Sequence, residues 1–176
     1  MRKSVKQQLA LRVLSTAALM AMVSSIATAA FAAEYNVKDG SVEIVAKDGI
    51  QSITQRDDTG AFVKDEKGDI DHRQDDDIIL TTKNKDTGET ETTSNTVTIT
   101  AEDGNTANVT LQDVHIETEG SWNNTGSAPI EIKGNGDTKL ELNGDNTVLS
   151  GDRYHAAIEK ADKNGHGTLT IKDDLN

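Results

Sequence analysis

Two short stretches of this chain carry side chains that suit the binding of a sugar ring. The first is Trp122-Asn123-Asn124, and the second is Arg153-Tyr154. An aromatic ring offers a platform for the C–H face of a sugar, while amide and guanidinium groups bond to its hydroxyls. The stretches lie 31 positions apart, from 122 to 153, so a repeat of that period would bring them together. Alternatively, both are ordinary turns whose rings cover the rim of a core.

A second stretch, from Arg56 to Asp77, is rich in aspartate and poor in apolar residues. Several carboxylates brought together favour a hard cation such as Ca²⁺. The candidate ligands are Asp69, Asp71, Asp75, Asp76 and Asp77. The EF-hand order and the glycine-rich nonapeptides of calcium-loaded β-rolls are both absent from the sequence. The segment is therefore predicted to be a solvated insertion loop, with Ca²⁺ as the one candidate cofactor.

No catalytic residue is predicted. The chain contains no Cys, and its four His lie in no nucleophile motif and at no zinc-ligand spacing. His115 alternates with Val114 and Ile116, so it is expected to face solvent. The outward strand positions mix charges without gathering acids around one Arg; they include Glu131, Lys133, Lys139 and Glu141.

The elements that would position these side chains are short strands that return at nearly fixed spacing. Val109-Thr110-Leu111 recurs as Leu140-Glu141-Leu142 and Leu169-Thr170-Ile171, and Ile78-Ile79-Leu80 lies 31 positions before it. A second phrase keeps a similar period; it reads Val97-Thr98-Ile99, then Ile130-Glu131-Ile132, then Ala156-Ala157-Ile158. Two different phrases with one period indicate a repeat architecture, in which each unit buries its apolar face on the next.

The period favours an all-β right-handed parallel β-helix, a single-stranded solenoid with about 29–31 residues per rung. A β-sandwich is the alternative, because Asp-Gly and Asn-Gly dipeptides also suit hairpins. The β-helix domain is predicted to span 33–176, with the acidic insertion at 56–77 and regular repeats at 78–176. Three lines of core residues are predicted; they are Ile78, Val109, Leu140 and Leu169, then Leu80, Leu111, Leu142 and Ile171, then Ile99, Ile130 and Ile158.

Several of these phrases resemble secreted bacterial surface proteins described as carbohydrate-binding-domain or pectate-lyase-like right-handed β-helix proteins. The phrases are Asn95–Thr100, Asn108–Ile116, Ala128–Ile132, Leu140–Thr147, His155–Glu159 and Gly167–Ile171. The resemblance implies a non-catalytic glycan-binding or adhesive module, with a polysaccharide lyase or glycosidase as the alternative. In that family further rungs usually follow the last phrase, so the β-helix is expected to be incomplete at its C-terminus.

The first 32 residues have the pattern of a secretory signal peptide. Four basic residues come first, an apolar run spans Val13–Ile26, and Ala30-Phe31-Ala32 is a small-x-small cleavage site. Without these residues the formal net charge changes from −12 to −16, because the four basic residues are lost and no acid is. Such a charge opposes binding to nucleic acid. We therefore expect a secreted or cell-surface protein without a membrane span after cleavage, whose partner is a polysaccharide or a host or cell-surface glycan.

Overall fold

The computed structural model describes residues 33–120, 126–160 and 166–173, and in these ranges the protein is all-β. They contain no α-helix, and their helical content is the 3₁₀ turn η1 (Val37–Asp39). Most of the described strands belong to three larger sheets, in which neighbours are mainly parallel. The predicted signal peptide lies outside the described residues.

The first sheet has the order β1-β7-β10-β13-β16; its strands are β1 (Glu34–Asn36), β7 (Ile78–Thr81), β10 (Thr106–Gln112), β13 (Asp137–Asn143) and β16 (Leu169–Asp173). The second, β14-β11-β8, contains β8 (Thr92–Thr93), β11 (His115–Thr118) and β14 (Thr147–Ser150). The third, β15-β12-β9-β2-β3-β6, contains β2 (Ser41–Lys47), β3 (Ile50–Arg56), β6 (Arg73–Gln74), β9 (Val97–Ala101), β12 (Ile130–Lys133) and β15 (Ile158–Lys160). A separate hairpin pairs β4 (Lys64–Asp65) with β5 (Gly68–Asp69).

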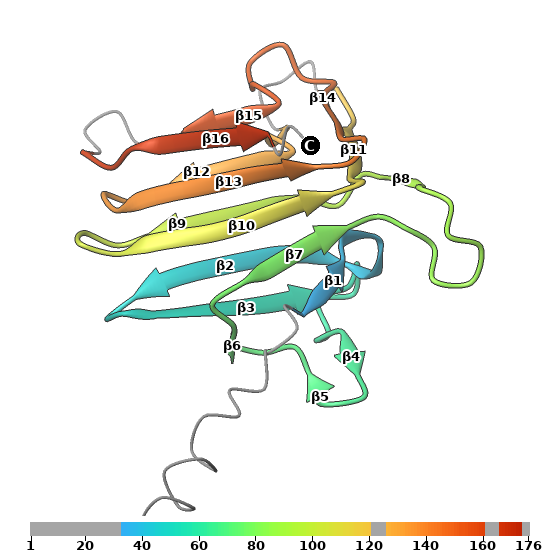
Figure 1. The fold of residues 1–176 in the computed structure, drawn as a ribbon. Coiled ribbons are helices and arrows are strands. Elements are labelled where there is room, and N and C mark those ends of the chain that lie inside the picture. Colours follow the sequence, from blue (N-terminus) through green and yellow to red (C-terminus); the bar gives the residue numbers. More distant parts are fainter. Residues whose placement is uncertain (1–32, 121–125, 161–165, 174–176) are drawn as a thin grey trace, which may run out of the picture. The chain divides into compact units, whose positions relative to one another are not determined.

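From β7 onward the chain visits the three sheets in a fixed order. It passes through the first, second and third sheet and then returns to the first, three times over. Each named strand from β10 onward pairs in parallel with the strand one visit earlier in the same sheet. Figure 1 shows β7, β10, β13 and β16 side by side in that order. This arrangement is consistent with a β-helix, whereas a sandwich joined by hairpins would pair consecutive strands antiparallel.

The register of the first sheet keeps a constant step. Ile78, Val109, Leu140 and Ile171 pair in series, each 31 positions after the last. The predicted line ended at Leu169 and was wrong there, because Leu169 pairs with Thr138. The prediction aligned the first apolar residue of each phrase, and this placed the last member of the line at Leu169, two positions before Ile171. Two residues keep a side chain on the same face of a strand, so alternation alone could not reveal the slip.

The other two predicted lines need similar corrections. Leu111 pairs with Leu80 and Leu142 as predicted, but Leu142 pairs with Asp173 and is only partly buried. In the third sheet Ile130 pairs with Val97 and Ile158, so Ile99 lies opposite Ile132. The steps there are 33 and 28 positions, because the loops between the sheets differ in length while the ladder register is preserved.

The core lies between the inward faces of the three sheets. Along β10 the residues Val109 and Leu111 are buried, whereas Asn108 is exposed and Thr110 is half-buried. Leu111, Ile116 and Ile132 come from different sheets and are all 0% exposed. Each such side chain stabilises the fold by about 1.5–3 kcal/mol through removal of apolar surface from water. The alternate side chains point outward and form regular rows on the surface of the sheets.

The first strands of the third sheet differ from this pattern. β2 and β3 form an antiparallel hairpin around Asp48-Gly49, which have positive φ values of 52° and 76°. An Asp-Gly pair suits this turn, since both positions of such a turn need positive φ. The acidic segment follows β3 and is mostly exposed, but it is more than a loop. It contains β4, β5 and β6, and its Ile70 joins the core at 4% exposure, which was not expected.

Candidate functional site

The outer face of the first sheet carries a compact group of polar and charged side chains. Alternation along β10 and β13 points Asn108, Thr110, Lys139 and Glu141 away from the core. The ladder places Asn108 opposite Lys139, and Thr110 opposite Glu141. Lys172 of β16 lies opposite Glu141 on its other side. Neighbouring strands are about 4.8 Å apart, so these side chains come within contact range of one another.

This face is hollowed between the strands. The hollow has a volume of about 190 Å³ and is lined by Asp77, Ile78, Asn108, Val109, Thr110, Lys139, Leu140, Glu141 and Lys172. Ile78, Val109 and Leu140 have buried side chains and form its floor. Ligand pockets of proteins usually measure about 300–1,000 Å³, so this one suits a single small ring or one unit of a chain.

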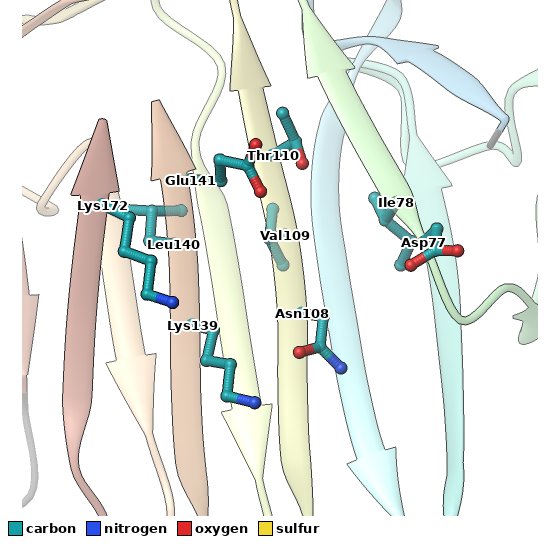
Figure 2. A pocket seen from close by; sticks show the side chains of 9 residues that line it. All are labelled: Asp77, Ile78, Asn108, Val109, Thr110, Lys139, Leu140, Glu141 and Lys172. Carbon is teal, nitrogen blue, oxygen red and sulfur yellow. The ribbon is translucent and has the colours of Figure 1, made fainter. Parts of the chain in front are cut away.

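The two ammonium groups and the Glu141 carboxylate occupy different parts of the hollow. Figure 2 shows the ammonium groups of Lys139 and Lys172 on the same side as the Asn108 amide. The Glu141 carboxylate lies beside Thr110, away from the ammonium groups. A ligand in the hollow therefore meets two ammonium groups at one end and the Glu141 carboxylate at the other, while the Asp77 carboxylate lies beside Ile78 (Figure 2).

The sequence contained a signal for this site that phrase matching did not use. Thr110, Glu141 and Lys172 follow one another at 31 positions, as do Asn108 and Lys139. The buried residues from Ile78 to Ile171 keep the same spacing of 31 positions, and these polar residues occupy the outward positions beside them. Applying the period to polar residues would have found the rows. It would not have shown the hollow, which depends on side-chain packing.

The predicted sugar-binding edge is described only in part. Trp122, Asn123 and Asn124 lie outside the described residues, so their predicted meeting with Arg153 and Tyr154 stays a prediction. The Arg153 guanidinium carbon lies 5.2 Å from the centre of the Tyr154 ring, which is 53% exposed. The Tyr154 N–H donates to Asp152 Oδ1 at 2.8 Å. These contacts fix the position of the exposed Tyr154 ring in the turn that follows β14.

A second groove, with a volume of about 390 Å³, lies where β8, β11 and β14 of the second sheet end. Its lining consists of Thr92, Thr93, Ser94, Glu117, Thr118, Glu119, Gly120 and Gly151. The chain segments that follow β11 and β14 approach closely at Gly120 and Gly151. A Cβ added to Gly120 would lie only 2.4 Å from the Gly151 carbonyl oxygen. Gly151 is three residues before Tyr154, so the groove and the exposed Tyr154 ring belong to successive parts of one turn.

The aspartates predicted as Ca²⁺ ligands are not brought together. The described residues contain no group of three or more His, Cys, Asp or Glu that could hold a metal ion. Asp69 pairs with Lys64 at 3.1 Å, and Asp71 Oδ1 lies 2.6 Å from His72 Nδ1. Asp76 and Asp77 are exposed on the approach to β7.

Asp75 has a structural partner in the core. The Tyr35 hydroxyl donates to Asp75 Oδ2 at 2.9 Å, and the Tyr35 ring is 3% exposed. Burial, together with the nearby Asp75 carboxylate, raises the pKa of Tyr35 far above its ordinary value of 10.0. Tyr35 therefore stays protonated and keeps donating this hydrogen bond, which ties the end of the acidic segment to β1.

Within the part of the chain that the structure describes, no helix is long and apolar enough to cross a membrane. Comparison of the chain with protein-family models, with curated proteins and with solved structures found no match. The family resemblance of the phrases therefore remains an expectation about fold and function.

Proposed function

We propose that this protein is a non-catalytic, exported module with a right-handed parallel β-helix fold, which binds glycans on the outer face of its first sheet. The observation that carries the proposal is the polar hollow formed by Asn108, Lys139, Glu141 and Lys172. Export to the cell surface or medium is supported by the signal-peptide pattern of the first 32 residues.

The fold part of this proposal is supported by the order in which the chain visits its sheets. A solenoid requires equivalent strands to lie in register at a constant step, and the first sheet keeps a step of 31 over three pairings. Right-handedness follows from the strong preference of parallel crossover connections for that hand. Each rung would then contribute one strand to each sheet, and the outward rows would be rows of rungs.

The binding part is supported by the chemistry of the hollow. Sugar hydroxyls both donate and accept, so they match a surface that offers Glu141 as acceptor and Lys139 and Asn108 as donors. Among the residues that the structure describes, no aromatic ring lines the hollow. Affinity for a single sugar unit should therefore be low, and useful binding would depend on several units of a polymer engaging at once.

A glycan array probed with the purified protein tests this proposal. Binding should occur, should persist in excess EDTA, and should be weakened by Lys139→Ala. Lys133→Ala is the matched control, because Lys133 is an outward lysine on β12 that pairs with Glu131 at 2.7 Å outside the hollow. Absence of binding to every glycan would overturn the proposal.

Two further readouts separate the remaining alternatives. Loss of binding with Tyr154→Ala but not with Lys139→Ala would move the site to the edge predicted from Trp122, Asn123, Asn124, Arg153 and Tyr154. Release of soluble products from an acidic plant polysaccharide would make the protein a polysaccharide-degrading enzyme.

A further inference from the structure

The hollow on the first sheet has balanced charge in a strongly acidic protein. Lys139 and Lys172 face Glu141 and Asp77 around it, two charges of each sign. The chain without its first 32 residues carries a formal charge of −16. The summed field of such a protein repels small anions before they reach any local lysine. A ligand with only negative charge is therefore poorly matched to this site.

A ligand with only positive charge is matched no better. It would be drawn by the overall field, but two ammonium groups stand in the hollow. Lys172 lies opposite Glu141 in the ladder, and Lys139 lies two residues before Glu141 on the same strand. Both ammonium groups therefore share the hollow with Glu141 and lower the attraction of its carboxylate for another cation.

We propose that the hollow takes a zwitterionic sugar unit, one that carries both a carboxylate and a free amine. Its carboxylate would lie at the end formed by Lys139, Lys172 and Asn108, and its ammonium group at Glu141. Such a ligand carries no net charge, so the field of the protein does not repel it. Contacts among the exposed side chains of the hollow are exchanged for contacts with the ligand at small cost, since exposed ion pairs contribute little. This inference rests on the proposed glycan-binding function of the same site.

Four related monosaccharides test the inference directly. Muramic acid carries a carboxylate and an amine, N-acetylmuramic acid only the carboxylate, glucosamine only the amine, and N-acetylglucosamine neither. Titration followed by isothermal calorimetry or by amide chemical shifts should rank muramic acid first, by about tenfold over each of the other three. Raising the salt concentration should reduce this advantage, because the charges in the hollow are exposed.

Two substitutions in the hollow should act differently on the ranking. Lys139→Ala should remove the advantage of muramic acid over glucosamine, because the carboxylate loses a partner. Glu141→Ala should remove its advantage over N-acetylmuramic acid, because the amine loses its partner. Lys133→Ala and Glu131→Ala are matched controls from the outward pair on β12 and should leave the ranking unchanged.

The outcomes separate this inference from the proposed function. Equal binding of all four sugars, or tighter binding of N-acetylmuramic acid or glucosamine, would overturn the zwitterion inference and leave glycan binding intact. An unchanged ranking in both Lys139→Ala and Glu141→Ala would likewise overturn it. No binding of any of the four sugars would overturn the inference here, while the glycan array decides the proposed function independently.

Discussion

The hairpin region, residues 33–77, and the repeat region, residues 78–173, use buried polar groups in different ways. Along β10 of the repeat region, inward residues are apolar and outward residues are polar. On β3 of the hairpin region four residues are buried, and Gln51, Thr54 and Gln55 among them are polar. β3 pairs antiparallel with both β2 and β6, whereas the named strands of the repeat region pair in parallel.

The buried glutamines bond to backbone groups that no strand reaches. Gln51 accepts from the Asn108 N–H at 2.6 Å and donates to the Asn108 carbonyl at 3.0 Å, as a neighbouring strand would. Gln55 donates to the carbonyls of Asn36 and Gly40 at 2.7 and 2.9 Å. In the repeat region, the backbone N–H and C=O groups therefore form their hydrogen bonds in a regular ladder of parallel strands. Where the ladder is irregular, side-chain amides take its place.

The largest predicted effects come from the shared core. Ile53 of β3 and Leu111 of β10 are both 0% exposed, one in each region. Ile53→Ala and Leu111→Ala should each lower the free energy of unfolding by about 2–5 kcal/mol. Urea denaturation should show one transition in both variants, because the two regions share a core. A separate early transition in Ile53→Ala would show that the hairpin region unfolds independently.

A smaller effect is predicted for the side-chain amides. Gln55→Leu keeps the side-chain bulk but leaves two carbonyl groups without their donor, so it should lower the free energy of unfolding by about 1–3 kcal/mol. Gln112→Leu, at a partly exposed outward position of β10, is the matched control from the repeat region. It should change stability by less than about 0.5 kcal/mol. Equal losses in the two variants would remove the distinction between the regions.

The smallest effects are pH-dependent. The Lys83 ammonium, 2.6 Å from Asp113 Oδ2, holds the pKa of Asp113 below its ordinary value of 3.8. Arg73 does the same for the pKa of Asp65 in the hairpin region. A lowered native pKa means that the charged carboxylate stabilises the fold above the unfolded-state pKa. This contribution is lost as the pH falls through the native value.

Acid titration of the melting temperature checks this comparison. Asp113→Asn and Asp65→Asn should each flatten the loss of stability below about pH 4 and change little at pH 7 in high salt, because Asp65 is exposed and Asp113 is only partly buried. A variant that melts with the same acid dependence as the parent protein would show that its ion pair does not stabilise the fold.

The sequence allowed the repeat to be predicted because alternation and period are carried by the apolar residues themselves. The period placed Val109 and Leu140 correctly, and the predicted line failed by two positions at Leu169, because two residues keep a side chain on the same face of a strand. The outward row of Thr110, Glu141 and Lys172 keeps the same period, but it was not predicted, because only apolar residues were matched. The partners of Gln51 and Asp75 could not be predicted, because they lie 57 and 40 positions away and obey no repeat.

Amide chemical shifts of the isotope-labelled protein during titration with a glycan that it binds test the central claim most directly. If the outer face of the first sheet is the site, the largest shifts should cluster at Asn108, Thr110, Lys139, Glu141 and Lys172. The amides of Glu131 and Lys133, on the outward face of β12, should stay in place. Shifts confined to Arg153 and Tyr154, or spread evenly over the surface, would contradict the account.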